Sequence, residues 1–172
     1  LRGIGHREIV FVDLDLDFPV FRDRQKVFLE EIAENGAARP EKYIYRVKYD
    51  GISNEMIGKI FREHPRLTAL FFAVSHAPGF SSLLPARGVR IPEDVSLVSL
   101  DESDFTSEDG RLSVISEPSW NIGRRAAEIL RRLVNDPAAF AEPEYFKGEL
   151  IVRKSCASPG KHLAGAFRST DK

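Results

Sequence analysis

The sequence predicts an α/β fold in which a parallel sheet carries helices on both faces. Short apolar runs of β-branched and aromatic residues, typical of buried strands, alternate with helical segments along the first part of the chain. We expect strands at 8–12, 43–47, 67–73 and 95–100. Regular alternation of strand and helix favours parallel pairing, because each helix carries the chain back across the sheet before the next strand begins.

Punctuating residues delimit the helices between these strands. Asp17 is expected to cap the first helix, with Pro19 in its first turn and Gly36 just past its end. Ser53 is expected to cap the second helix. Pro78 lies in the third helical stretch, where it is restricted to the first turn or kinks the helix.

The second half of the chain is less regular. We expect two further strands at 112–115 and 146–152, with a helix between them that Ser119 caps and Pro137 stops. Apolar residues recur through this helix at the spacing of one helical face. They are Ile122, Ala126, Ile129, Leu130 and Leu133.

The composition is that of one compact domain. Of the 172 residues, 42% are hydrophobic and 30% are charged, and such a chain can form a core without a metal or a disulfide. The 25 basic residues are balanced by 26 acidic ones, so this segment by itself is not expected to bind DNA strongly. Cys156 is the only cysteine, which fits a reducing cytoplasm. No apolar run approaches the roughly 20 residues of a membrane helix, and no signal peptide opens the chain.

Three aspartates follow the first predicted strand and raise the question of catalysis. Asp13 and Asp15 form a D-x-D pair that could hold Mg²⁺ and supply the nucleophile of a phosphatase. That chemistry requires a hydroxyl residue two positions after Asp15, but Asp17 stands there. An acidic loop is therefore the preferred interpretation. The histidines lack metal-site spacing, and neither a glycine-rich nucleotide loop nor a nucleophile elbow occurs. We therefore predict neither an enzyme nor a bound metal or cofactor.

Two residues stand out by their position in the predicted sheet. Ligands of open parallel sheets bind at the carboxyl ends of the strands. Arg24 lies early in the first helix, and Asp101 comes directly after the strand at 95–100. A guanidinium and a carboxylate that face one cleft can hydrogen-bond a small polyhydroxylated ligand from two sides. The alternative is that Arg24 and Asp101 pair with each other or with solvent.

Several segments resemble the effector-binding domain of LacI/GalR transcriptional regulators. The strongest match is G-V-R-I-P-E-D-V-S-L-V-S-L-D at 88–101, which is similar to the family's G-x-x-I-P-E-D-V-S-V-V-G-F-D. The run G-H-R-E-I-V-F-V at 5–12 resembles G-H-R-x-I-x-F-I, and L-S-V-I-S-E-P at 112–118 resembles L-T-T-I-x-Q-P. The similarity extends from about residue 5 to residue 155, with the segments in the family's order.

This resemblance implies a periplasmic-binding-protein-like fold, in which two Rossmann-like subdomains hold an effector between them. Residues 1–110 and 144–156 would form the second subdomain, 111–137 a segment that crosses to a largely missing first subdomain, and 157–172 a tail. The chain starts as if inside a longer sequence, so we expect operator DNA to be bound through an N-terminal helix-turn-helix that is absent here. The resemblance further implies a sugar or nucleobase effector and a cytoplasmic homodimer without membrane contact. A transporter-type solute-binding protein is the alternative that shares this fold.

By the same resemblance, Arg24 and Asp101 fall on the arginine and the aspartate that contact the effector. The chain departs from the family pattern at Val74 and Ser75, where an asparagine and an aspartate are usual, and at Ser53, where many members carry an aromatic residue. Glu117 replaces the usual glutamine. We therefore expect an unusual effector or a loss of effector binding. The candidate ligand-binding residues are Arg24, Asp101, Ser53, Val74 and Ser75.

Overall fold

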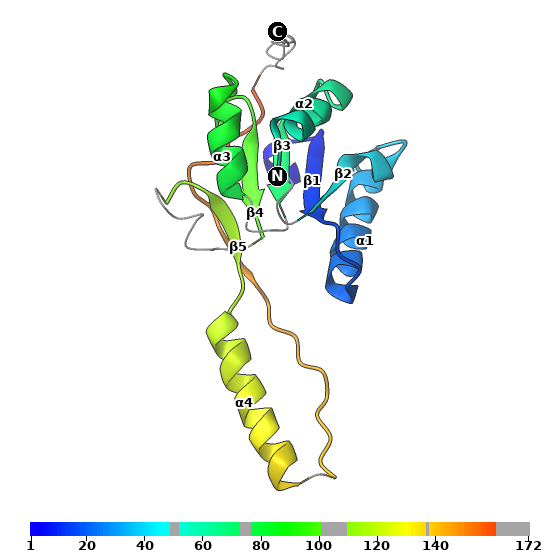
Figure 1. The fold of residues 1–172 in the computed structure, drawn as a ribbon, viewed down its shortest axis with the longest axis vertical. Coiled ribbons are helices and arrows are strands. Elements are labelled where there is room, and N and C mark those ends of the chain that lie inside the picture. The colour runs from blue at the N-terminus through cyan, green and yellow to red at the C-terminus, as the bar shows by residue number, and fades with distance from the viewer. Residues whose placement is uncertain (49–51, 73–76, 101–109, 137, 161–172) are drawn as a thin grey trace.

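A computed structural model describes residues 1–160 except 49–51, 73–76, 101–109 and 137 (Figure 1). Within these residues the strands form one six-stranded sheet in the order β2-β1-β3-β4-β5-β6. The strands are β1 (Ile9–Leu14), β2 (Ile44–Val47), β3 (Ala69–Phe72), β4 (Ser96–Ser99), β5 (Ser113–Ser116) and β6 (Glu149–Ile151). The pairs among β1 to β4 are parallel, as predicted. Strand β5 also pairs in parallel with β4, whereas β6 adds to β5 as an antiparallel edge strand. Strands β3 and β6 are shorter than the sequence suggests.

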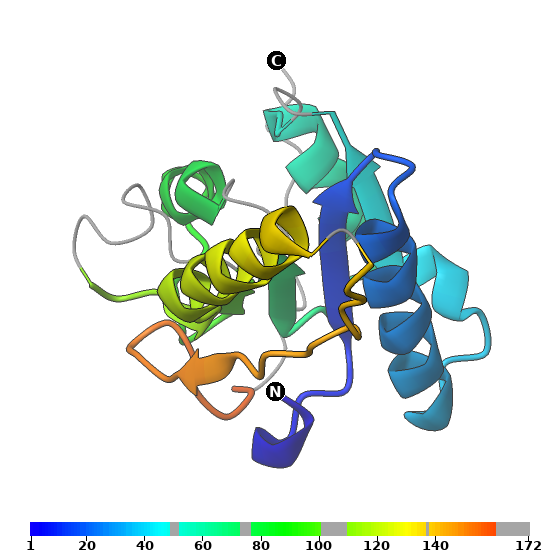
Figure 2. The same cartoon turned by 90° about the horizontal axis from the view of Figure 1, so that it is seen from below.

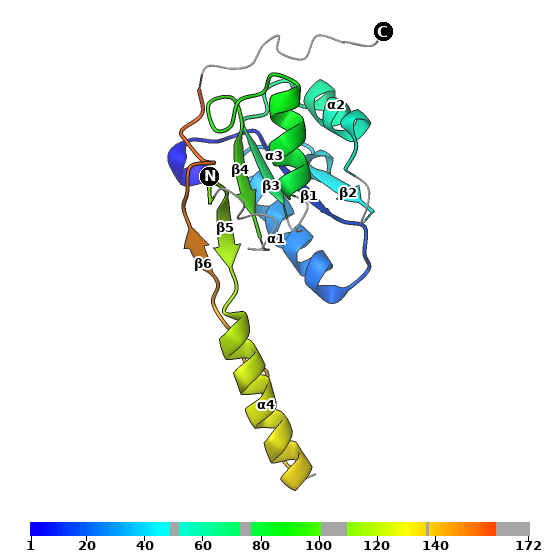
Figure 3. The same ribbon diagram turned by 60° about the vertical axis from the view of Figure 1, so that its left-hand side comes forward.

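Helices cover both faces of the sheet, which confirms the predicted α/β class (Figure 2). Helix α1 (Pro19–Glu34) lies against one face, and α2 (Asn54–Glu63) and α3 (Ala77–Ala86) lie against the other. Helix α4 (Ser119–Asn135) points away from the sheet (Figures 1 and 3). In the described part of the chain, no helix combines the length and the apolar character needed to cross a lipid bilayer.

Alternate residues of the central strands supply the core on each face. Strand side chains point to opposite faces in turn, so a strand that is covered on both sides must be apolar throughout. Ile9 and Ala69 pack with Ile32 of α1 on one face. The larger cluster on the other face includes Val10, Val12, Ile57, Ile60, Leu70, Phe72, Leu84 and Leu97. Because strands β1 to β5 pair in parallel, their carboxyl ends lie at one edge of the domain.

The start of α1 differs from the prediction. Phe18, not Asp17, is the N-cap residue, and no side chain caps the helix. The helix begins at Pro19, whose ring suits the first helical position, so Asp17 lies one residue too early to cap it. Asp17 instead accepts a hydrogen bond from Arg22, with 2.8 Å between Oδ1 and Nη1. Gly36 follows the end of the helix with φ +92°, a conformation that favours glycine, as expected.

The caps of α2 and α4 confirm one prediction and correct another. Ser53 is the N-cap of α2, and its hydroxyl accepts a hydrogen bond from the Met56 amide at 3.2 Å. Ser119 is the first residue of α4 and does not cap it, because the N-cap position belongs to Pro118. The Ser119 hydroxyl turns back to the Glu117 carbonyl at 3.4 Å.

Two buried histidines, which lie near the amino ends of the parallel strands, form hydrogen bonds that hold neighbouring segments in place. The His6 ring lies 2.9 Å from the Thr68 hydroxyl and donates through Nε2 to the Ala157 carbonyl at 2.9 Å. His64 donates through Nε2 to the Lys42 carbonyl at 3.0 Å. Burial lowers the pKa of both rings, although in each case the bond to the carbonyl opposes this change. Both rings therefore stay neutral down to a lower pH in the folded chain than in the unfolded chain.

The two histidines should contribute a fall in the free energy of unfolding on acidification from pH 7 to pH 5. The unfolded chain takes up protons on these rings as the pH falls through 6.5, while the folded chain, with its lowered pKa values, takes them up only at lower pH. Urea titrations at several pH values measure this slope. His64→Gln keeps a donor for the Lys42 carbonyl but cannot titrate, so its slope should be smaller. Parallel curves for the two proteins would contradict the assignment.

Candidate functional site

The candidate site lies at the carboxyl edge of the sheet, where α1 follows β1. Arg24 lies in the second turn of α1, and its side chain is 27% exposed. Its Nη2 donates to Oε1 of Glu117 at 3.3 Å, and its guanidinium lies 5.9 Å from the centroid of the Phe21 ring. Glu117 follows β5 on the way to α4, so this ion pair joins segments that are 93 residues apart.

A buried polar network lies beside Arg24. Asp13 of β1 is fully buried, and its Oδ2 accepts a hydrogen bond from Nε2 of Gln25 at 2.7 Å. Its Oδ1 accepts from the Leu14 amide at 2.9 Å. The side-chain oxygen Oε1 of Gln25 accepts twice from Arg46 of β2, at 3.1 Å from Nε and 2.8 Å from Nη2. This Asp13–Gln25–Arg46 network fixes the start of α1 against β1 and β2.

The network determines the state of the Asp13 carboxyl. Burial raises its pKa, and the hydrogen bonds from Gln25 and Leu14, with the charges of Arg24 and Arg46, oppose that rise. Because both carboxyl oxygens are bonded within the protein, Asp13 is not presented to a ligand. Asp15, in contrast, is exposed. The Asp13 and Asp15 phosphatase hypothesis is therefore not favoured: Asp13 has a structural role.

The other predicted site residues divide into two groups. Ser53 is exposed after β2, and its hydroxyl is engaged as the N-cap of α2. Asp101, Val74 and Ser75 lie outside the described residues, so the predicted meeting of Arg24 with Asp101 stays a prediction.

Sequence reasoning missed Gln25 and Arg46 as contributors to this edge, and it noted Glu117 only as a departure from the family pattern. Gln25 carries a usable signal, because it lies four residues after Phe21 and three before Phe28, on the apolar face of its helix. A polar residue in that position is buried and needs partners. For Glu117 the signal was a charged residue in the place of the family's glutamine, but the local sequence did not reveal its partner.

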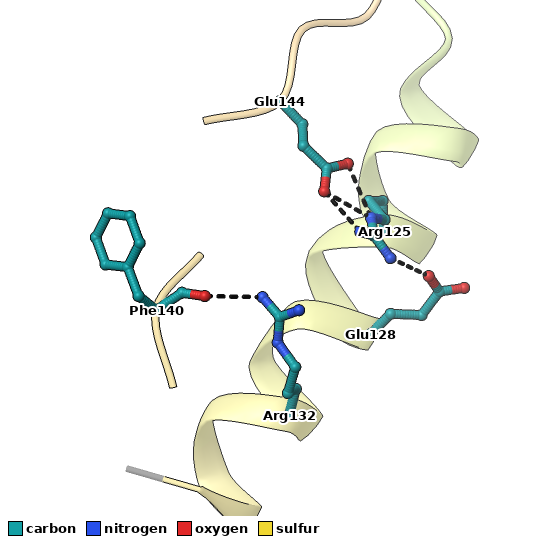
Figure 4. A network of polar contacts seen from close by, with 5 residues as sticks. All are labelled: Arg125, Glu128, Arg132, Phe140 and Glu144. Atoms are coloured by element: carbon teal, nitrogen blue, oxygen red, sulfur yellow. Dashed lines mark hydrogen bonds and ion pairs between the residues drawn. The ribbon is translucent and has the colours of Figure 1, made fainter. Parts of the chain in front are cut away.

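Helix α4 and the segment 138–148 that returns from it form an arm that stands away from the sheet (Figure 3). Figure 4 shows how the two halves are joined: Arg125 donates to Glu144, with contacts of 2.6–3.0 Å, and to Glu128 at 3.0 Å. Arg132 donates to the Phe140 carbonyl at 3.1 Å. No residue of α4 is buried, and Leu130 is 62% exposed. An amphipathic helix whose apolar residues are exposed usually packs against another part of the protein or against a partner.

Comparisons with known proteins agree on one kind of relative. A family model described as periplasmic binding protein-like domain matches residues 1–156. The HTH-type transcriptional regulator AscG of Escherichia coli (strain K12) is 29% identical over 165 residues, which are 94% of this chain and 48% of that protein.

Two solved structures show the same similarity. One is a sugar-binding transcriptional regulator of the LacI family from Escherichia coli in complex with phosphate, with 28% identity, a TM-score of 0.71 and coverage of 92% of this chain and 58% of that one. The other is a LacI family regulator from Bifidobacterium animalis subsp. lactis, with 25% identity, a TM-score of 0.76 and coverage of 94% and 59%. The chain spans about half the length of the curated relatives it matches.

Proposed function

Because the chain belongs to the periplasmic binding protein-like domain family, in its LacI-type regulator branch, we propose that it is the ligand-sensing part of a DNA-binding transcriptional regulator. The observation that carries this proposal is Arg24, a half-buried guanidinium at the carboxyl edge of a parallel sheet. Ligands of such sheets bind at that edge. The chain would recognise a small molecule there and catalyse no reaction. A transporter subunit is not favoured, because these relatives are named as transcriptional regulators.

The arm supports a two-subdomain organisation. We infer that residues 1–110 and 144–156 form one effector-binding subdomain, and that 111–137 crosses to a second one. The apolar stripe of α4 would pack into that second subdomain, since none of its residues is buried here. An effector held between the two subdomains would shift the equilibrium between their arrangements, and with it the affinity for DNA. Operator binding through a helix-turn-helix, a homodimer and a cytoplasmic location complete this proposal.

The proposed effector is a small polar metabolite such as a sugar. Arg24 supplies several N–H donors, and Asp101 would supply acceptors from the other side of the cleft. The sugar-binding relative from Escherichia coli supports this class. Valine at position 74 and serine at positions 53 and 75 offer fewer polar groups than an asparagine, an aspartate and an aromatic platform would. The pocket should therefore differ from that of a standard hexose sensor.

Arg24→Ala should weaken effector binding at least about tenfold, because a hydrogen bond from a charged donor is lost. Calorimetry of the full-length protein against a panel of sugars and nucleosides identifies the effector and measures the loss. Arg22→Ala is the matched control, since Arg22 lies on the same helix, is 60% exposed and pairs with Asp17. If Arg24→Ala binds the effector as tightly as the parent protein does, the site is misassigned.

A further inference from the structure

The pairing of Arg24 with Glu117 constrains what the site can bind. Their 3.3 Å contact places a carboxylate beside the donors that a ligand would use. The charge of Arg24 also acts on the buried carboxyl of Asp13, where it opposes the rise in pKa that burial causes. Two other arginines near this edge also have partners within the protein: Arg46 donates twice to Gln25, and Arg22 pairs with Asp17.

Glu117 is held in place by its backbone. It comes directly after β5, whose last residue, Ser116, pairs with Glu149 of β6. The Ser119 amide and hydroxyl both donate to the Glu117 carbonyl, at 2.8 Å and 3.4 Å. These contacts fix the backbone of Glu117, from which its side chain reaches Arg24 of α1.

We propose that Glu117 is a specificity residue that excludes anionic groups from Arg24, so that the effector meets this guanidinium with neutral oxygens such as sugar hydroxyls. The inference rests on the proposed function, in which Arg24 contacts the effector. A hydroxyl can accept from Arg24 and donate to Glu117 at the same time. A phosphate or carboxylate at the same place would approach the Glu117 carboxylate, and like charges in contact are unfavourable. Glutamine at position 117 would impose no such penalty.

Inorganic phosphate provides a test that needs no knowledge of the effector. Calorimetry of the full-length protein at constant ionic strength should detect phosphate binding in Glu117→Gln that is at least about tenfold tighter than in the parent protein. The gain should disappear in the double variant Arg24→Gln/Glu117→Gln, because phosphate then has no guanidinium to bind. Glu34→Gln is the matched control, since it removes the same charge from an exposed position at the other end of α1.

Each alternative result overturns the proposal. Phosphate binding by the parent protein that Arg24→Gln abolishes would show that Glu117 does not exclude anions. Equal phosphate affinity in the parent and in Glu117→Gln would show that another feature governs access to Arg24. An equal gain in Glu34→Gln would assign the effect to net charge. Failure of the proposed function would be seen separately, as unchanged effector affinity in Arg24→Ala.

Discussion

Replacing Leu70 with alanine should lower the free energy of unfolding by about 3 kcal/mol. Leu70 is fully buried in β3, which lies between β1 and β4, and it belongs to the larger of the two core clusters. Its removal costs the burial of the side chain and leaves a cavity that a sheet strand paired on both sides cannot close. Guanidinium denaturation of the parent and the variant, followed by circular dichroism, measures the difference.

Val27→Ala is the control for this prediction. Val27 lies on α1 with 58% of its surface exposed, so its truncation should change the free energy of unfolding by less than about 0.5 kcal/mol. The core assignment would be wrong if Leu70→Ala and Val27→Ala were destabilised to the same extent.

Gln25→Leu should lower the free energy of unfolding by about 2–3 kcal/mol at pH 8. Gln25 is the link between Asp13 and Arg46, and leucine would leave a buried carboxylate without the side-chain donor at its Oδ2. The loss should be smaller at pH 5. The pKa of Asp13 is already raised by burial, and without the Gln25 bond it rises further, so the folded variant gains a proton as the pH falls and recovers stability. Urea titrations at both pH values test the direction.

The double variant Asp13→Asn/Gln25→Leu separates charge from packing. With asparagine at position 13 the network holds no buried carboxylate, so Gln25→Leu should cost less in this background than in the parent, and its cost should not vary with pH. Equal losses at pH 5 and pH 8 in the single variant would mean that Asp13 does not carry the effect.

The Asp13–Gln25–Arg46 network also explains how α1 presents Arg24. Gln25 is the next residue along the helix, and its three hydrogen bonds hold the first turns of α1 against β1 and β2. Arg24 is thereby directed to the carboxyl edge, where it reaches Glu117. A change at Gln25 should thus disturb the candidate site as well as the stability of the domain.

Much of the architecture could be predicted from local patterns. A run such as Ile9 to Val12, apolar at every position, indicates a strand covered on both faces. Pro19, Gly36 and Ser53 mark helix ends, because each has a backbone or hydrogen-bonding preference that acts within a few residues. Arg24 was predicted as a candidate site residue from its place early in the helix that follows a predicted parallel strand, together with the family resemblance.

Other features depend on contacts that no local pattern contains. The antiparallel edge strand β6 is set by its partner β5, and the burial of Asp13 is made tolerable by Gln25 and Arg46 from two other elements. The Arg24–Glu117 pair joins positions 93 residues apart. Backbone preferences act over a few residues, whereas charge pairing and burial depend on which segments the folded chain brings together. For this reason the edge of the sheet could be located from the sequence, but the carboxylate that shares it with Arg24 was revealed only by the three-dimensional arrangement.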